Sequence, residues 1–176
     1  MEIHRIEEHA ISAENHQGIE QLFVHCFADY PPHQSFFKQL PSFRYLAFEG
    51  DELIGHLAVD HRMMNISGQV SPIFGIVDFC VHPDFQSRRI GSHLLEQLEV
   101  LARKSRIDFI VLMAKERGIY EQHDFQLVDG YCRWLIIQNF QTLGVGQRRL
   151  DDCLMYKALG EATWGEGPID FLGWIF

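Results

Sequence analysis

The feature that most constrains this chain is a change of hydrophobic period near its middle. Residues 69–81 are apolar and β-branched like a strand, whereas residues 87–104 carry apolar side chains at helical spacing. The run DFIVLMA at 108–114 follows, and its unbroken apolar character is typical of a strand buried on both faces. A strand reached through a helix pairs in parallel with the strand before it. The segment therefore predicts a strand-helix-strand crossover.

Further elements flank this crossover. Before it, the pattern predicts a strand at 2–6 and then a helix whose apolar face comprises Ile19, Leu22, Phe23, Cys26 and Phe27. This helix is expected to stop at Asp29-Tyr30-Pro31-Pro32, and a short helix is expected at 33–40. Antiparallel strands at 43–49 and 52–64 then lead into 69–81. After it, the pattern predicts a short helix near 116–124, a strand at 133–138, a polar loop from Asn139 to Leu150 that includes GVGQRR, and a strand at 152–158.

This order of elements predicts one domain over residues 1–176. A chain of 176 residues with 47% hydrophobic residues and 14 Phe can bury a core of its own. The expected fold class is α/β (α+β), with a mixed, mainly antiparallel sheet of six to seven strands and helices on both faces. Residues 159–176 form a tail that is expected to pack on the domain, as an edge strand or through Trp164, Phe171 and Trp174, or to fold back over a cleft of the domain.

Charge and cysteine content limit the partners and the compartment. A formal charge of −9 argues against nucleic acid or an anionic membrane as partners, since both are bound through clustered Lys and Arg. The four cysteines show no Cys-x-x-Cys pair, and the histidines show no spacing suited to zinc, so no metal is expected. The charged N-terminus lacks an apolar signal core. We expect a cytoplasmic protein.

The junction of strand and helix has the ingredients of an anion site. A helix that begins near Ser87 or Arg88 leaves several backbone N–H groups without partners, and Arg88 and Arg89 add positive charge there. Gly91 would let a ligand approach the backbone closely. The alternative is an amphipathic helix whose first turn carries surface arginines, since cations there oppose the helix dipole.

The segment VDFCVHPDFQSRRIGSHLLEQL, followed by IYEQHDF, resembles the GNAT acetyltransferase superfamily. Members carry Gln/Arg-x-x-Gly-x-Gly/Ala between a strand and a long helix, and later Tyr-x-x-x-Gly-Phe. Arg89 stands where the family usually has its first glycine, and Asp124 stands at the glycine before phenylalanine. These two departures keep open a non-catalytic coenzyme A-binding regulatory module beside the enzyme.

The resemblance implies acetyl-CoA as the acyl donor and no metal cofactor. The pantetheine arm would run along a splayed central strand pair at Phe79, Cys80 and Val81. The pyrophosphate would lie on the backbone of Gln86, Ser87, Arg88, Arg89, Ile90, Gly91 and Ser92. Cys80 could instead carry the acyl group covalently, but a single cysteine in a strand is more typical of a small buried hydrophobe.

The resemblance also implies two catalytic residues. Tyr120 matches the tyrosine that protonates the departing thiolate; the alternative is a half-buried core tyrosine on a short helix. Asp78 lies where several members carry an acidic residue, and it would act as the general base. Strict alternation points it away from the face of Val77 and Phe79, so the role requires a β-bulge.

The acceptor is expected to be a primary amine of a small molecule, such as an aminoglycoside, a polyamine or an amino-acid derivative; a peptide N-terminus and a homodimer are left open. The ending TWGEGPIDFLGWIF resembles the branch of aminoglycoside 2'-N-acetyltransferases and Nod-factor N-acyltransferases. If the tail covers the cleft, Asp170 and the carboxylate of Phe176 are expected to bind a cationic amine.

Overall fold

The computed structural model describes residues 1–28 and 30–176, and the chain divides into two compact units. The first unit comprises Met1–Asp60 and Val77–Gln97, and the second comprises His61–Ile76 and Leu98–Phe176. Strands β3 (Glu52–Ile66) and β4 (Gln69–Val81) and helix α2 (Ile90–Lys104) each pass from one unit to the other. The single domain expected over the whole chain stays a prediction.

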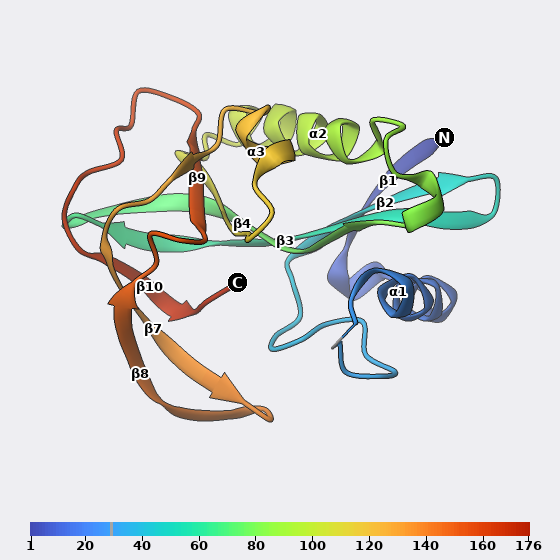
Figure 1. Cartoon of the computed structure of the whole chain (residues 1–176), viewed down its shortest axis with the longest axis horizontal. Helices are drawn as coiled ribbons and strands as arrows, with labels where there is room; N and C mark the ends of the chain where they lie inside the picture. The colour runs from blue at the N-terminus through green and yellow to red at the C-terminus, as the bar shows by residue number, and fades with distance from the viewer. Residues whose placement is uncertain (29) are drawn as a thin grey trace. The chain divides into compact units, whose positions relative to one another are not determined.

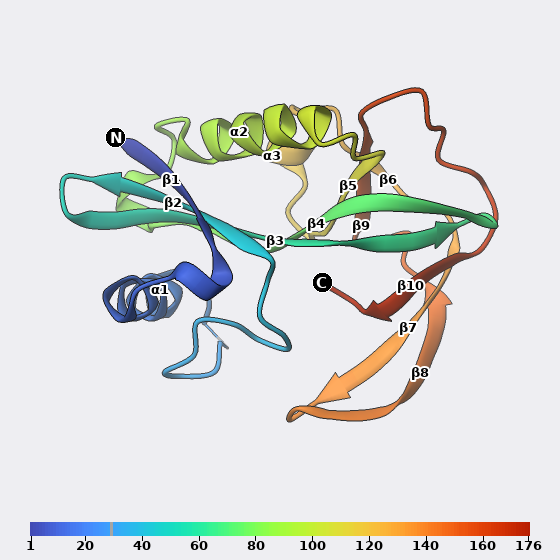
Figure 2. The ribbon, with the colours of Figure 1, turned by 180° about the vertical axis from the view of Figure 1, so that it is seen from behind.

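The first unit is built on antiparallel strands that follow one another in the sequence. β1 (Glu2–Glu7) pairs with β2 (Phe43–Glu49), and β2 pairs with β3. The 3-10 turns η1 (Glu8–Ala10) and η2 (Pro83–Phe85) follow β1 and β4. Helix α1 (Ala13–Cys26) and the start of α2 lie on opposite faces of these strands (Figures 1 and 2). The first unit therefore has helices on both faces, as expected.

Helix α1 is stabilised by a capping residue at its start and by an apolar face. The Ser12 side chain accepts a hydrogen bond from the backbone N–H of Asn15 at 3.1 Å, which satisfies one of the exposed donors at the helix start. Its buried face packs with one residue of β2 and one of β4; this cluster comprises Ile19, Leu22, Phe23, Leu46 and Cys80. The cluster anchors the end of α1 close to the second half of β4.

The second unit contains the remaining strands. In chain order they are β5 (Phe109–Met113), β6 (Gln126–Leu127), β7 (Tyr131–Gln138), β8 (Gln141–Arg149), β9 (Leu154–Ala158) and β10 (Ile169–Trp174), and α3 (Gly118–Glu121) lies between β5 and β6. Together with β3 and β4, their order in the sheet is β6-β9-β5-β4-β3-β10-β7-β8. β5 runs parallel to β4 with Ile73 opposite Phe109, so the predicted crossover is confirmed.

The predicted fold class is confirmed, with a different strand count. Most pairs are antiparallel, and the parallel ones are β4 with β5 and β10 with β7. The described residues form ten strands, where the sequence predicted six to seven. None of their helices combines the length and apolar character that a membrane span requires.

The short helix predicted at 33–40 is wrong. These residues form turns and bends, and His33 has a positive φ of 58°. The segment is held by side-chain bonds instead: the Ser35 hydroxyl bonds the ring of His16 at 2.9 Å, and the Ser35 carbonyl accepts from Arg44 at 2.6 Å. Contacts to distant residues have replaced local helix bonds. Helix α1 ends at Cys26, and Asp29 of the predicted stop lies outside the described residues.

The polar loop predicted from Asn139 to Leu150 is wrong as well. Most of it is strand β8, which pairs antiparallel with β7, and GVGQRR lies within that strand. Its glycines concealed the strand, since glycine is a poor strand former. Gly146 is required here because a Cβ at that position would approach Trp134 Cε2 within 2.7 Å. Packing of a large ring on the neighbouring strand therefore explains the glycine.

The tail is not an edge strand. β10 lies inside the sheet, antiparallel to β3 and parallel to β7, and Ile169 and Phe171 are buried in the second unit's core. The predicted packing of Trp164 is confirmed, because its ring stacks on Tyr156 at 4.3 Å between centroids. Strand pairing and side-chain burial together fix this end of the chain.

Candidate functional site

Strand β4 changes conformation at Asp78. This residue has a φ of 47°, in the left-handed region that an extended strand excludes, while β4 continues to Val81. A local break of this kind re-aims the side chain, which the sequence required if Asp78 were to serve as a base. The sequence-predicted position thus coincides with the irregularity in the strand.

A buried polar chain supports the backbone at this break. The His56 Nδ1 donates to the Asp78 carbonyl at 2.6 Å, and the Arg44 Nη1 donates to the His56 Nε2 at 3.1 Å. Because a guanidinium only donates, His56 must carry its proton on Nδ1. Burial, and then the charge of Arg44, lower the pKa of His56 to about 3. A neutral imidazole therefore holds the strained carbonyl.

Arg44 is in turn neutralised by a carboxylate. Its side chain is fully buried, with Nε and Nη2 donating to the two Glu8 oxygens at 2.6 and 2.9 Å. Its Nη1 also donates to the Ser35 carbonyl at 2.6 Å. Such a two-pronged pair fixes geometry as well as charge. Glu8, Arg44 and His56, called the support chain below, connect η1, β2 and β3 to Asp78.

The Asp78 carboxyl group itself faces a pocket of the first unit. Tyr30 donates its hydroxyl to Asp78 Oδ2 at 2.9 Å. Burial raises the pKa of Asp78, and the Tyr30 hydrogen bond and the Arg44 charge oppose that shift. Burial, and then the Asp78 charge, also raise the pKa of Tyr30. A carboxyl group with a raised pKa is a stronger base than an ordinary aspartate, and it titrates closer to neutral pH.

The residues after the break lie on the last part of β4. Cys80 is buried and packs against Ile19, Leu22 and Phe23 of α1. Burial, and then Cys26, raise the pKa of Cys80 well above its usual value, which suits a buried hydrophobe better than a nucleophile. In the described residues, β4 pairs with β5 only over Ile73–Gly75, while β4 itself continues to Val81.

The loop into α2 differs slightly from the sequence prediction. The helix begins at Ile90 and not at Ser87 or Arg88, because Ser87 and Arg89 have positive φ values of 63° and 61°. Arg88 donates to the Asp84 carbonyl at 3.3 Å, and its guanidinium carbon lies 4.8 Å from the centre of the Phe85 ring. The first N–H groups of a helix have no partner within it, so this end can accept an anion.

Tyr120 and Asp124 lie in the second unit. Tyr120 is on α3, partly buried, and its ring meets Phe125 edge to face at 5.8 Å. The Tyr120 carbonyl accepts from the Phe125 N–H at 3.0 Å, which closes the turn after the helix. Asp124, within that turn, has a φ of 63°. Arg89 and Asp124 therefore both adopt the conformation that glycine favours, at the two positions where the resemblance led us to expect glycine.

Comparison with known proteins decides the family. The model of the acetyltransferase (GNAT) domain matches residues 8–128. The chain belongs to the GNAT acetyltransferase family. Its membership places it among the acyltransferases. No curated protein sequence matches the chain.

Solved structures show the same fold at low identity. Eis1 from Mycobacterium abscessus superposes with a TM-score of 0.63 and 18% identity, over 76% of this chain and 33% of that one. A GNAT family acetyltransferase from Brucella melitensis, in complex with acetyl-CoA, gives 0.60 and 15%, over 96% and 94%. The GNAT protein YhbS from Escherichia coli, in complex with CoA, gives 0.58 and 14%, over 96% and 88%. This GNAT domain thus spans about a third of Eis1 and nearly all of the second protein.

Asp170 and Phe176, predicted to bind the acceptor, both belong to the second unit. Asp170 Oδ2 lies 3.8 Å from Arg133 Nε, and Asp170 Oδ1 accepts from the Leu172 N–H at 2.9 Å. The Phe176 ring covers Gly75, where a Cβ would come within 1.9 Å of Phe176 Cε1. Both residues therefore have contacts within their own unit, and their role toward an amine stays a prediction.

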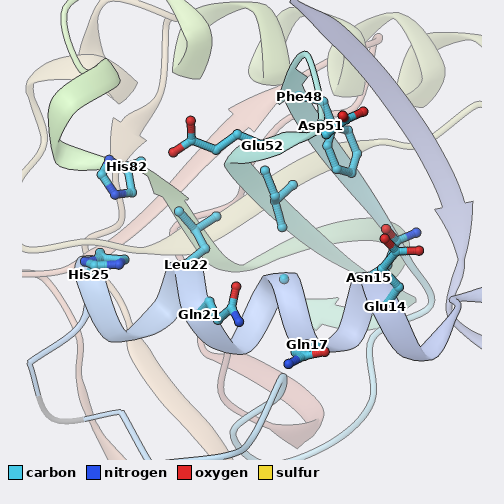
Figure 3. Close-up of a pocket in the computed structure, with 12 residues that line it drawn as sticks. Glu14, Asn15, Gln17, Gln21, Leu22, His25, Phe48, Asp51, Glu52 and His82 are labelled. Atoms are coloured by element: carbon cyan, nitrogen blue, oxygen red, sulfur yellow. The ribbon is translucent and has the colours of Figure 1, made fainter.

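A second pocket of the first unit is acidic. It has a volume of about 400 Å³ and lies between α1 and the hairpin of β2 and β3 (Figure 3). Glu14, Asp51 and Glu52 line it, with His25 and His82, whose rings lie 4.8 Å apart. Among the residues that the structure describes, no group of three or more His, Cys, Asp or Glu side chains is placed to hold a metal ion.

The sequence did not indicate several residues that contact Asp78 or support its backbone. Tyr30 stood only within a predicted helix stop, and His56 belonged to no predicted motif. Arg44 offered a signal, since it is a charged residue within the apolar strand FRYLAFE, where a buried cation requires a partner. Nothing in the spacing of Glu8, Arg44 and His56 indicated that they would meet.

Proposed function

We propose that this GNAT domain transfers an acetyl group from acetyl-CoA to the primary amine of a small molecule. The observation that carries the proposal is the broken strand at Asp78, which leads through Phe79–Val81 into a helix start with positive φ values at Ser87 and Arg89. A base and an anion site lie at the two ends of this segment, as direct transfer requires.

The donor would use the second half of that segment. Its pantetheine arm would run along Phe79–Val81, and its pyrophosphate would lie on the backbone N–H groups of residues 86–92. Arg88 and Arg89 would add charge. The fold shared with the Brucella and Escherichia coli proteins, which were crystallised with acetyl-CoA and CoA, supports this donor.

The chemistry is a direct transfer without an acyl-enzyme. The amine nitrogen attacks the thioester carbonyl, the new C–N bond forms, and the C–S bond to coenzyme A breaks. Asp78 accepts the proton that the nitrogen loses. A backbone N–H near Phe79–Val81 polarises the carbonyl as negative charge develops. Tyr120 gives its proton to the departing thiolate and recovers one from solvent, and Asp78 releases its proton to solvent, so the protein is unchanged after each cycle.

Two departures from the family pattern no longer favour a non-catalytic module. Arg89 and Asp124 replace glycines of the family, yet both hold left-handed backbone at φ 61° and 63°. The loop shape that glycine would give is therefore kept. A coenzyme A-binding module would need the same loop, so Asp78 and Tyr120 are what favour the enzyme, and turnover separates the two alternatives.

Positioning matters more to this proposal than the base does. Orientation of two reactants contributes about 7–11 kcal/mol to lowering a barrier, whereas one general base supplies about 10²–10⁴ in rate. Replacing Asp78 with Asn should therefore slow turnover without abolishing it. The loss should shrink as the pH rises, because more of the amine is then already unprotonated.

The first experiment tests the donor site. Binding of coenzyme A is measured by calorimetry at low and at physiological salt. Replacing Arg88 and Arg89 together with Ala should weaken binding, and the loss should be larger at low salt because screening is weaker there. Lys104→Ala with Arg106→Ala, at the other end of the same helix, removes the same charge and serves as the control. Equal affinity of both double variants would contradict the anion site.

The second experiment tests the acid. Tyr120→Phe should lower turnover by about 10²–10⁴ with little change in coenzyme A affinity, because only the transition state gains from the proton. Release of coenzyme A thiol is followed with a panel of primary amines. Tyr131→Phe, which alters an exposed tyrosine of the same unit, is the control. Unchanged turnover of Tyr120→Phe would contradict the general-acid role and would mean that Tyr120 only packs against its neighbours.

A further inference from the structure

The pocket that contains Asp78 has aromatic walls. Its described lining consists of Cys26, Phe27, Ala28, Tyr30, Pro31, Phe37 and Asp78, and its volume of about 440 Å³ falls in the range of small-molecule sites. Phe27 and Tyr30 stack with ring centroids 5.5 Å apart and planes at 30°, and Phe37 lies 6.1 Å from Tyr30. Flat rings of this kind bind flat apolar groups through area and offer their negative faces to cations.

The charges around this pocket allow for one cation. Among the described residues that line it, Asp78 is the one ionisable carboxylate. Two cations, Arg44 and Lys38, and one further carboxylate, Asp60, act on that carboxyl group, and the Lys38 Nζ lies 5.4 Å from the centre of the Phe37 ring. One ammonium group can pair with Asp78. A second ammonium group would meet the like charge of Lys38, and no second carboxylate among the described lining residues would pair with it.

The acidic pocket of the same unit provides the contrast. Its lining includes Glu14, Asp51 and Glu52, so a polycation would be bound better there. That lining does not include Asp78 or any residue after His82. Attraction of a polyamine to the first unit would therefore draw it away from the candidate base, not toward it.

We infer that the acceptor of this GNAT domain is a small monoamine with a flat apolar body, of the arylalkylamine type. The inference rests on the proposed function and names its substrate class. The ring of the acceptor packs among Phe27, Tyr30 and Phe37, and its amine lies at Asp78. Polyamines and aminoglycosides, which the sequence left open, carry several separated charges and no flat apolar face.

The test compares amines that differ in one property at a time. Acetyl transfer from acetyl-CoA is followed with 2-phenylethylamine, butylamine, 1,4-diaminobutane and kanamycin. The expected kcat/KM for 2-phenylethylamine exceeds that for butylamine by about tenfold or more, since a buried ring adds contact area. It should exceed that for 1,4-diaminobutane by a larger factor, because among the described residues that line the pocket only Asp78 can pair with an ammonium group.

A variant pair assigns the preference to the pocket. Phe37 is 51% exposed, so Phe37→Ala should leave the fold intact and raise the KM for 2-phenylethylamine about fivefold or more, with the KM for acetyl-CoA unchanged. Butylamine should respond less. Phe140→Ala, which removes an exposed phenylalanine outside the described pocket lining, should change neither constant.

The outcomes separate the two proposals. If 1,4-diaminobutane or kanamycin is acetylated with the higher kcat/KM, or if Phe37→Ala and Phe140→Ala behave alike, the substrate class is wrong and the proposed function stands. If none of the four amines is acetylated while coenzyme A still binds, transfer to a small amine is wrong, and the substrate class with it.

Discussion

Each unit of this protein buries a cation, and the two cations are neutralised in different ways. Among the described residues, Arg44 is fully buried in the first unit and Lys157 is 7% exposed in the second. Arg44 donates hydrogen bonds to both carboxylate oxygens of Glu8, whose side chain is 10% exposed. Lys157 pairs with Glu99 at 2.6 Å and lies 3.7 Å from Asp124, whose side chain is 89% exposed.

The contacts of the two ion pairs indicate which buried cation is connected to the candidate site. The Arg44 pair continues through His56 to the carbonyl of Asp78, so any movement of the pair is transmitted to the break in β4. The Lys157 pair joins β9 to α2, and the carboxylates around Lys157 are exposed to solvent in part or in full. We therefore expect the first pair to affect both stability and catalysis, and the second to affect stability alone.

The largest effect is expected from Arg44→Met. The substitution leaves the nearly buried Glu8 carboxylate without its partner, which typically costs about 3–5 kcal/mol. The free energy of unfolding in urea should fall by that amount. Adding Glu8→Gln should recover part of the loss, because the remaining group is then uncharged. A loss below about 1 kcal/mol in the single variant would mean that the pair is not desolvated as the structure describes.

The next effect concerns pH and the neutral His56. Its pKa in the folded protein is about 3, below the usual value near 6.5, so the unfolded chain binds a proton first as the pH falls. Stability from this group is present above pH 6.5 and is lost progressively toward pH 3. Linkage over the interval from pH 6.5 to 4.5 gives about 2 kcal/mol.

A variant isolates this contribution from the other titrating groups. Asp78 acts in the opposite direction, because its raised pKa contributes stability at low pH that is lost as the pH rises. His56→Gln keeps a donor and an acceptor but does not titrate. The difference in unfolding free energy between the protein and this variant should therefore shrink from pH 7 to pH 4.5. A pH-independent difference would show that His56 is not held neutral.

A smaller effect is expected from Lys157→Met in the second unit. In this variant Glu99 still pairs with Arg103 at 2.7 Å and is partly exposed, so the Glu99 carboxylate does not become a buried, unpaired charge. We expect a loss of about 1–2 kcal/mol, measured by urea unfolding, with turnover unchanged. Loss of turnover in Lys157→Met as great as in Arg44→Met would remove the distinction between the two pairs.

The fold could be predicted where local patterns decide it. The period change into α2 and the unbroken apolar run of β5 gave the crossover, because both depend on neighbouring residues. β8 could not be predicted in the same way. Its glycines and polar residues become a strand only through pairing with β7 and the fit of Gly146 beneath Trp134.

The candidate site divides along the same line. Asp78 and the loop at Arg88 and Arg89 were found from a continuous stretch of sequence. The support chain was not, because Glu8, Arg44 and His56 come from separate elements and only the folded sheet brings them together. A β-bulge at Asp78 was expected only as a requirement of its proposed role, and the left-handed φ of this residue could not be read from its sequence.

The smallest effects are expected at Arg89 and Asp124, two of the left-handed residues, one in each unit. Arg89 at φ 61° has a long side chain with an exposed ion pair to Glu96 at 3.7 Å, which contributes little. Arg89→Gly should relieve the backbone strain and stabilise the protein by about 0.5–1 kcal/mol, after the extra freedom of glycine in the unfolded chain is subtracted. Asp124→Gly should be nearly neutral, since aspartate tolerates this conformation and its carboxylate lies near Lys157.

Melting temperatures of both variants are compared with that of Arg88→Gly, which alters a neighbouring arginine without a positive φ and should only destabilise. If Arg89→Gly lowers the melting temperature as much as Arg88→Gly does, Arg89 carries no strain, and the difference from Asp124 lies in the side chains alone.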